Sequence, residues 1–159
     1  MISHPFPPLF DENSEILILG SFPSVKSREQ LFFYGHPQNR FWKVLSGVLD
    51  QQTPNSIEEK KAFLMQNNIA LWDVIASCEI QGSADSSIKN AAANDISIIL
   101  EKGKIKKIFT NGHAAKKLYD QFIFPKVKIE AFLLPSTSPA NAAWSLDRLT
   151  DAWKIIKDR

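Results

Sequence analysis

The chain has 159 residues and a mass of 18.0 kDa, and its 44% hydrophobic and 23% charged residues exclude a disordered or fibrous protein. Nineteen Lys and Arg against seventeen Asp and Glu leave a net charge of +2, so affinity for nucleic acid would require a local surface and not bulk charge. The single cysteine, Cys78, excludes an intramolecular disulfide and a multi-cysteine metal site. We therefore expect one domain over residues 1–159, in a reducing compartment.

The N-terminal segment contains Pro5, Pro7 and Pro8 and predicts an extended lead-in. It lacks the basic and then apolar stretches of a secretion signal. No apolar run approaches the roughly 20 residues that a membrane-spanning helix needs. These features indicate a cytoplasmic protein with no membrane partner.

Four short apolar runs predict strands. Residues 16–19 (ILIL) form an unbroken run that ends at Gly20, which is typical of a strand buried on both faces of a parallel sheet. Similar runs, rich in Ile, Val, Phe or Leu, occupy residues 69–75, 105–110 and 129–134.

Helical patterns separate these runs. Ser56 followed by Glu59 forms a capping box before an apolar pattern, and Asn94 or Asp95 could cap a second helix. Residues 113–122 have apolar positions four apart, as an amphipathic helix does. A closing helix carries apolar residues from 146 to 156, and the pair Ser138 and Pro139 offers its cap and first helical position.

Strands that alternate with helices predict an α/β fold, a three-layer sandwich with a central, mainly parallel four-stranded sheet. Sheets of this kind bind ligands beyond the carboxyl ends of their strands. The sequence places four polar segments there: residues 20–24, Asp73, residues 111–113 and residues 135–139. The patterns GxGxxG, GxxxxGK[ST], HExxH and GxSxG are absent, so dinucleotide, P-loop, zincin and hydrolase-elbow sites lose support.

Residues 32–42 combine aromatic side chains, amides and one guanidinium, a mixture that can stack a flat ring and bond its edge. Phe41 and Trp42 are expected to be core residues of the following helix. Asn39 precedes that helix and could simply be its N-cap.

Five blocks of the sequence resemble the hypoxanthine-DNA glycosylase branch of the uracil-DNA glycosylase superfamily. They are residues 17–24 (LILGSFPS), 34–42 (YGHPQNRFW), 82–90 (GSADSSIKN) with 94–95, 109–112 (FTNG) and 134–141 (LPSTSPAN). The resemblance covers nearly the whole chain and implies a uracil-DNA glycosylase-like fold for residues 1–159.

The resemblance implies a monofunctional glycosylase that hydrolyses the N-glycosidic bond of deaminated bases in DNA, chiefly hypoxanthine, during base excision repair. It implies no metal and no cofactor, and the partner is DNA containing a deaminated base; we expect a monomer. Two alternatives remain open. One is a glycosylase that prefers uracil or another deaminated base, and the other is a non-catalytic DNA or nucleotide binder with the same fold.

The resemblance also implies residue roles. Asn39 would orient the attacking water, and Tyr34 would stack on the flipped base unless it is a buried core tyrosine. Asp73 lies at the strand end where relatives read the base edge, and a carboxylate there could accept the N1 proton of hypoxanthine. The resemblance does not fix this role, because capping a helix or pairing with Lys or Arg would equally explain a lone carboxylate. Phe22 stands where relatives carry Asp or Asn, which makes uracil activity doubtful, and Asn111 would contact the base.

A loop resembling the second superfamily motif would hold the DNA, although the same residues could form a capped helix start. Its residues are Ser136, Thr137, Ser138, Pro139, Ala140 and Asn141, and Ser21, Ser24 and His36 would complete the DNA contacts. Ala140 and Asn141 offer little bulk for filling the space that a flipped base vacates.

Overall fold

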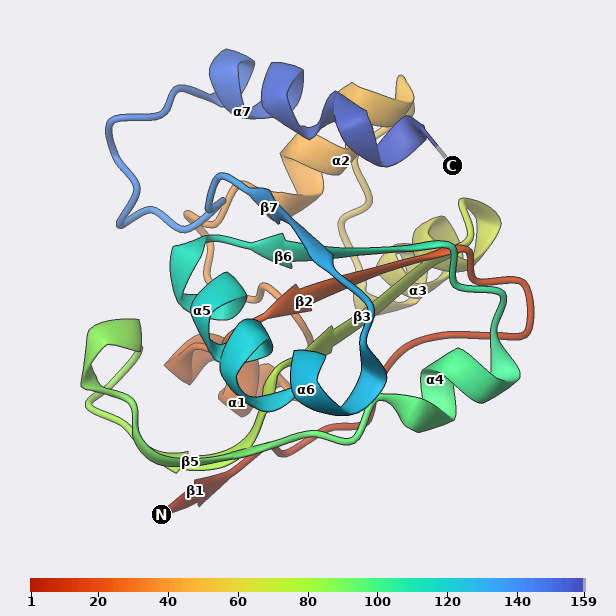
Figure 1. Ribbon diagram of the computed structural model, residues 1–159. Coiled ribbons are helices and arrows are strands. Elements are labelled where there is room, and N and C mark those ends of the chain that lie inside the picture. Colours follow the sequence, from red (N-terminus) through yellow and green to blue (C-terminus); the bar gives the residue numbers. More distant parts are fainter. Residues whose placement is uncertain (159) are drawn as a thin grey trace.

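The computed structural model describes residues 1–158 (Figure 1). Its centre is a sheet of four parallel strands in the order β3, β2, β6, β7. The strands span Ile16–Gly20 (β2), Ile69–Asp73 (β3), Lys107–Asn111 (β6) and Ala131–Leu134 (β7). The predicted α/β class and the four parallel strands are confirmed, and the observed strands are shorter than the apolar runs that predicted three of them.

The two faces of β2 explain why its residues are all apolar. Ile16 and Ile18 join a hydrophobic core beneath α2 (Phe41–Leu49), α3 (Ile57–Gln66) and α7 (Leu146–Trp153). Leu17 and Leu19 join a second core that includes residues of α4 (Ser97–Lys102) and α5 (His113–Phe122). In Figure 1, α2 and α7 lie together on one side of the sheet and α5 lies on the other. The three layers follow from this burial on both faces.

A second, three-stranded antiparallel sheet was not predicted. Its order is β1 (Ile2–Ser3), β4 (Ile75–Glu79) and β5 (Lys89–Ala93). The run at residues 69–75 therefore ends β3 at Asp73 and enters β4 at Ile75. The β5 sequence, KNAAA, has no β-branched or aromatic residue, and none of its positions is fully buried, so it carries no periodic signal.

Three helix signals in the sequence have different outcomes. The Ser56 capping box is confirmed: its hydroxyl accepts a bond from the Glu59 N–H at 3.0 Å, and Glu59 Oε1 accepts one from the Ser56 N–H at 3.2 Å. Asp95 accepts the Ser97 N–H at 3.0 Å at the start of α4. The predicted cap at Ser138 is wrong, because α7 begins at Leu146 and Ser145 caps it.

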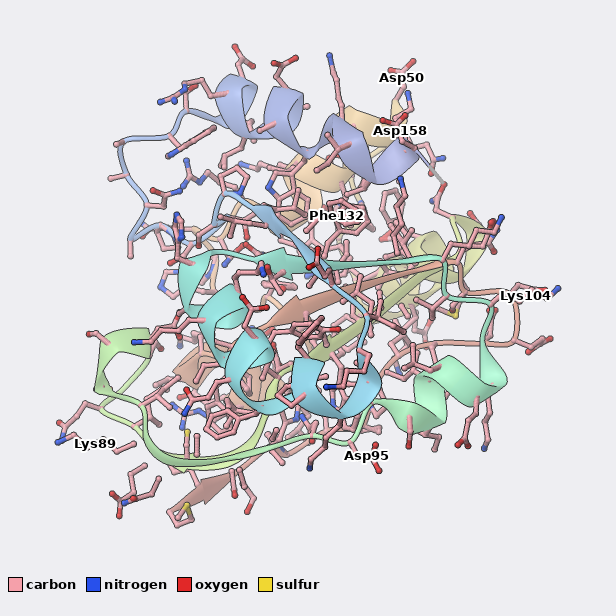
Figure 2. The ribbon with its side chains drawn as sticks, viewed as in Figure 1. Asp50, Lys89, Asp95, Lys104, Phe132 and Asp158 are labelled. Carbon is pink, nitrogen blue, oxygen red and sulfur yellow. The ribbon has the colours of Figure 1, made fainter. Side chains whose placement is uncertain are left out.

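Four short helices complete the secondary structure. They are α1 (Val25–Gln30), η1 (Asp85–Ser87), α6 (Phe124–Val127) and η2 (Lys154–Lys157). Figure 2 shows charged side chains such as Asp50, Lys89 and Lys104 on the outside of the ribbon, and all three are exposed. Within residues 1–158, no helix is long and apolar enough to span a membrane.

Candidate functional site

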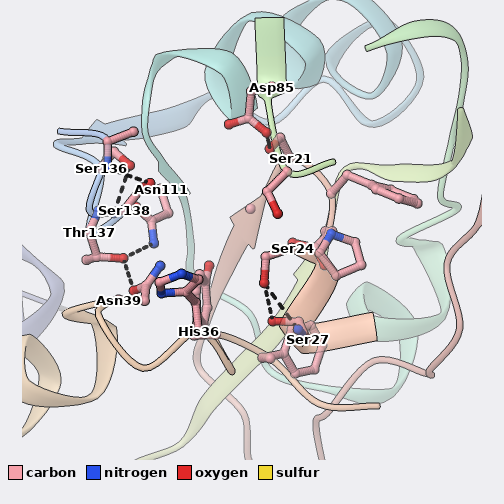
Figure 3. Close-up of a pocket in the computed structure, with 18 of the residues that line it drawn as sticks. Ser21, Ser24, Ser27, His36, Asn39, Asp85, Asn111, Ser136, Thr137 and Ser138 are labelled. Atoms are coloured by element: carbon pink, nitrogen blue, oxygen red, sulfur yellow. Dashed lines mark hydrogen bonds between the residues drawn. The ribbon is translucent and has the colours of Figure 1, made fainter. Parts of the chain in front are cut away.

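A pocket of about 400 Å³ lies at the carboxyl ends of β2, β3 and β6, beside the loop that follows β7 (Figure 3). It is lined by residues from all four places where the sequence predicted polar segments. The lining includes every predicted site residue except Asn141: Ser21, Phe22, Ser24, Tyr34, His36, Asn39, Asp73, Asn111, Ser136, Thr137, Ser138, Pro139 and Ala140.

Asn39 is held by a hydrogen-bond network at one wall of this pocket, drawn in Figure 3. Asn39 Oδ1 accepts a bond from the Thr137 hydroxyl at 2.8 Å and another from the Phe41 N–H at 2.9 Å. Thr137 is fully buried, and its hydroxyl accepts a bond from Asn111 Nδ2 at 3.0 Å. Asn111 Oδ1 in turn accepts the Thr137 N–H at 3.0 Å, so three segments far apart in the sequence fix one amide.

These bonds determine which atom of Asn39 is free. Both lone pairs of Oδ1 face donors, so the side chain cannot flip without losing two hydrogen bonds. Within residues 1–158 the amide nitrogen has no hydrogen-bond partner. The N-cap position of α2 is Arg40 and not Asn39 as predicted, but the Asn39 carbonyl still accepts the Phe41 N–H in the first turn of the helix. This bond leaves the N–H₂ group of Asn39 available to a ligand.

The aromatic ring of Tyr34 lines the same pocket. Its ring stacks on Phe41 with centroids 3.9 Å apart and planes 15° apart, so only the opposite face can meet a ligand. The backbone of Tyr34 is left-handed, with φ of 51°, which is uncommon for a bulky residue. Burial, the charge of Asp73 and, more weakly, that of Asp85 raise the pKa of the phenol far above its usual range, so the hydroxyl stays neutral. Within residues 1–158 this buried hydroxyl has no hydrogen-bond partner.

Asp73 ends β3 and is almost fully buried. Its Oδ2 accepts a hydrogen bond from His4 Nε2 at 2.7 Å, and the two side chains are 6% and 4% exposed. The partner is thus a histidine on the N-terminal segment, and neither a helix end nor the predicted Lys or Arg. A Cβ at Gly20 would stand 2.4 Å from Asp73 Oδ1, so the carboxylate fits only beside a glycine.

Asp85 forms another wall with Ser21. The Ser21 hydroxyl donates to Asp85 Oδ1 at 2.6 Å. The segment around Asp85 is docked on α1, because Arg28 donates to the Gly82 carbonyl at 2.7 Å and the Val25 N–H donates to Ser83 Oγ at 3.0 Å. Asp85 is exposed as a residue, but partial desolvation of its carboxyl group raises the pKa of that group. The bond from Ser21 lowers this pKa, and the charge of Asp73 raises it.

The loop after β7 closes the pocket and is organised by Arg40. Its guanidinium donates to the carbonyls of Ser138 at 2.9 Å and Asn141 at 3.1 Å, and also to that of Trp144. The Asn141 side chain turns back into the loop and donates to the Ser136 carbonyl at 3.0 Å. The loop therefore has a defined shape before any ligand is present, and Asn141 supports that shape from outside the pocket lining.

Neither His4 nor Asp85 is among the site residues predicted from the sequence. His4 lies 69 positions from Asp73, and a histidine in a proline-rich lead-in carries no local signal of such a contact. Asp85 lies within the block of residues 82–90, but only the fold shows that this block covers the pocket. Among residues 1–158, no group of three or more His, Cys, Asp or Glu side chains could hold a metal ion.

Comparisons with known proteins agree with this geometry. The Uracil DNA glycosylase superfamily profile matches residues 7–158. The chain is 37% identical over 158 residues to a protein of Methanosarcina acetivorans named hypoxanthine DNA glycosylase, covering 98% of both chains. It is 35% identical over 138 residues to a protein of the same name from Methanosarcina barkeri, covering 86% of both.

A solved structure supports the same relationship. The solution NMR structure of a Methanosarcina acetivorans protein described as a uracil DNA glycosylase matches with a TM-score of 0.81, 34% identity and 99% coverage of both chains. The superfamily match spans almost the entire chain, including every segment that lines the pocket. The chain belongs to the uracil DNA glycosylase superfamily.

Proposed function

We propose that this protein is a monofunctional DNA glycosylase that removes hypoxanthine from DNA by hydrolysing its N-glycosidic bond. The observation that carries the proposal is the Asn39 amide, fixed by Thr137 and Phe41 at the wall of a pocket of about 400 Å³. The names of the two similar Methanosarcina proteins support hypoxanthine as the base.

The substrate must leave the DNA stack to reach this site. The glycosidic carbon is shielded inside a duplex, so the nucleotide has to rotate out, at a cost of a few kcal/mol that is smaller for a mispaired base. Tyr34 offers one ring face for stacking, because Phe41 covers the other. Stacking on Tyr34 then replaces the stacking contacts that the base loses when it leaves the duplex.

Asn39 acts by position and not by basicity. An amide does not ionise near neutral pH, so it cannot take a proton from water. A water molecule that accepts a bond from the free Asn39 N–H₂ group keeps a second lone pair, which can be aimed at the C1′ atom of the sugar. Such positioning of the nucleophile accounts for a large part of the barrier reduction in enzymes.

Asp73 provides a way to read the base. Hypoxanthine carries a proton on N1, whereas adenine presents a lone pair there, so the carboxylate attracts the first base and repels the second. His4 occupies Oδ2 of Asp73, which leaves Oδ1 for this contact. Uracil also carries an N–H that could meet Asp73, so a preference for hypoxanthine over uracil depends on the remaining pocket wall, including Phe22.

The rim of the pocket suits a DNA backbone. Ser136 and Ser138 lie on a loop that Arg40 holds in place. Their hydroxyl oxygens accept the N–H groups of Ser138 and Ala140, which leaves the hydroxyl protons to donate to phosphate. Ser21, Ser24 and His36 also line the pocket.

The test is base release from duplexes that carry one labelled deoxyinosine or one deoxyuridine, with alkali cleavage to reveal abasic sites. The proposal predicts cleavage at deoxyinosine and little at deoxyuridine. Stronger cleavage at deoxyuridine would replace hypoxanthine by uracil as the substrate. Tight binding to both duplexes without any abasic product would identify a non-catalytic binder and overturn the proposal.

A further inference from the structure

The N-terminal segment reaches the wall of the pocket through one side chain, His4. The segment is held in place because β1 (Ile2–Ser3) pairs with β4 and the His4 N–H donates to the Ala76 carbonyl at 2.7 Å. The imidazole packs edge-on against the rings of Phe6 and Phe22, with centroids 4.5 Å and 6.0 Å away. The His4 side chain is only 4% exposed. Its ring is therefore fixed behind the pocket lining, where water has little access.

The hydrogen bonds of His4 determine where its proton lies. Nδ1 accepts the Phe6 N–H at 3.5 Å, so this nitrogen presents a lone pair. The ring proton is then on Nε2, which donates to Asp73 Oδ2 at 2.7 Å. Asp73 accepts this bond and needs no proton of its own. The contact therefore favours the carboxylate form of Asp73.

The second oxygen of Asp73, Oδ1, is left for a ligand. Asp73 lines the pocket, and its Oδ1 accepts no hydrogen bond from residues 1–158. A Cβ at Gly20 would stand 2.4 Å from this oxygen and 3.2 Å from the Tyr34 hydroxyl, so both polar groups lie beside the glycine that ends β2. The Tyr34 hydroxyl also has no partner in the described chain. Two polar atoms at this end of the pocket are thus unpaired within the protein.

We propose that His4 is a positioning residue that determines base specificity through Asp73. By bonding Oδ2, His4 keeps Asp73 an acceptor and leaves only Oδ1 for the base. Such an acceptor binds a base that presents a ring N–H, as hypoxanthine does, and repels a base that presents a lone pair there, as adenine does. This inference rests on the proposed function, because it requires Asp73 to contact the base.

Loss of the His4 bond changes the chemistry of Asp73. Without the Nε2–H donor, Asp73 Oδ2 is a buried, charged and unpaired oxygen, which is unfavourable unless the carboxylate takes up a proton or turns toward another donor. A protonated carboxyl group can donate to a lone pair. The pocket then no longer rejects adenine by its charge.

The test measures how substitutions of His4 change the preference between two bases. Duplexes that carry 2′-fluoro-deoxyinosine or 2′-fluoro-deoxyadenosine resist cleavage, because the fluorine disfavours the positive charge that develops on the sugar. Fluorescence anisotropy gives the dissociation constant for each duplex. Comparing the ratio of the two constants between protein variants cancels the free energy of extruding each nucleotide, since the DNA is the same throughout.

His4→Phe keeps an aromatic ring and removes the donor to Asp73. We expect its preference for the deoxyinosine analogue to be about tenfold weaker than that of wild type. His4→Gln is the matched variant, because its side-chain amide can still donate to Oδ2, and it should keep the preference within about threefold. A merely structural role of His4 would weaken the binding of both duplexes alike and leave the ratio unchanged.

Asp73→Asn gives a second readout that buries no charge at this position. The His4 Nε2–H can still donate to the amide oxygen, which turns the amide N–H₂ toward the pocket. The preference should then shift by more than about tenfold toward the deoxyadenosine analogue, because the N–H₂ group donates to the adenine lone pair. In the double variant His4→Phe/Asp73→Asn nothing fixes the orientation of the amide, so the shift should be smaller. This pair decides the question if His4→Phe alone does not fold.

The outcomes separate this inference from the proposed function. If folded His4→Phe has the wild-type ratio, if His4→Gln loses as much preference as His4→Phe, or if Asp73→Asn shows the same shift with and without His4, then His4 does not position Asp73, and the proposed function stands. If wild-type protein releases no hypoxanthine from a deoxyinosine duplex, the proposed function fails, and the role of His4 fails with it.

Discussion

Asn39, Thr137 and Asn111 show how single residues define this site. Thr137 was predicted to contact DNA, but it is fully buried and its hydroxyl joins the two amides. The carbonyl of Asn39 is used by the protein itself, and only its amide nitrogen remains for a ligand. The bond of Asn39 to the helix start and its proposed catalytic role are therefore compatible, because they use different atoms.

Thr137→Val tests this network, since it replaces the hydroxyl by a methyl group of similar size. Asn39 loses one of its two donors, so we expect excision to fall about tenfold through misplacement of the amide. Asn111 Nδ2 loses its acceptor, at a cost of about 1–3 kcal/mol in the free energy of unfolding. Single-turnover rates and thermal unfolding measure the two effects.

Thr137→Ser is the matched control, because it keeps the hydroxyl and removes only the methyl group. Excision by Thr137→Ser should stay close to wild type. An equal loss of activity in both variants would assign Thr137 to packing and would argue against the hydrogen-bond network.

Two candidate site residues could be predicted from the sequence because each stands at the end of an element among side chains of a different kind. Asp73 stands out because every neighbour in residues 70–75 is apolar, and Asn39 because it precedes an aromatic helix start. The partners of these residues could not be predicted. His4 and Thr137 lie 69 and 98 positions from the atoms that they bond, and no local pattern encodes contacts over such separations.

At the scale of elements, the loop over residues 135–145 is held by one cation. Arg40 donates to three of its carbonyls, and no carboxylate pairs with the Arg40 guanidinium among residues 1–158. Because Arg40 follows Asn39 directly, the same turn fixes both the Asn39 side-chain amide and the loop over residues 135–145. The position of the Asn39 amide and the shape of this loop, to which we assign the water and the DNA backbone, are therefore coupled through the start of α2.

Arg40→Lys should loosen this loop, since an ammonium group cannot reproduce the planar fork of a guanidinium. We expect faster amide hydrogen exchange over residues 138–144 and duplex affinity lower by about three- to tenfold. Fluorescence anisotropy with a deoxyinosine duplex measures the affinity.

Arg148→Lys makes the same chemical change at the other end of the loop. The Arg148 guanidinium lies over the Trp144 ring at 3.9 Å and bonds no loop carbonyl in the described chain. Arg148→Lys should bind the deoxyinosine duplex with nearly the affinity of wild type. Unchanged amide hydrogen exchange over residues 138–144 in Arg40→Lys would show that the loop is ordered without the Arg40 guanidinium.

Elements could be predicted where one physical signal dominates. Residues 16–19 are buried on both faces and read as a continuous apolar run, and Ser56 with Glu59 specifies a helix start by a reciprocal pair of bonds. The start of α7 was misplaced, because Ser138 and Ser145 are both able to cap a helix. Contacts from Arg40 and from the Asn141 side chain organise residues 138–144 as a loop, and no local pattern predicts them. The antiparallel sheet depends on pairing with β4 and has little signal of its own.

At the scale of the molecule, the fold brings four distant segments to one edge of the parallel sheet. A net charge of +2 and a pocket lined by no Lys or Arg among residues 1–158 set this surface apart from strongly basic DNA-binding faces. The rim is built mainly of neutral hydroxyl, backbone and proline groups. We therefore expect recognition to depend more on fit to an extruded nucleotide than on attraction to phosphate.

This charge distribution predicts a weak dependence of DNA affinity on salt. Few cations at the site mean few released counterions, so the slope of log Kobs against log salt should be about −2 to −3. Affinity for a deoxyinosine duplex, measured between low and moderate salt, gives the slope. A slope steeper than about −6 would mean that a basic face outside the pocket dominates binding.

The most direct test of the account compares wild-type protein and Asn39→Ala in single-turnover release of hypoxanthine, at protein concentrations that saturate the duplex. Losing the bond to the Phe41 N–H should cost about 1 kcal/mol of stability, so both proteins must be shown to be folded and bound. The account predicts that wild-type protein releases hypoxanthine and that Asn39→Ala is about 10²- to 10³-fold slower. A folded, bound Asn39→Ala that releases hypoxanthine as fast as wild type would contradict it.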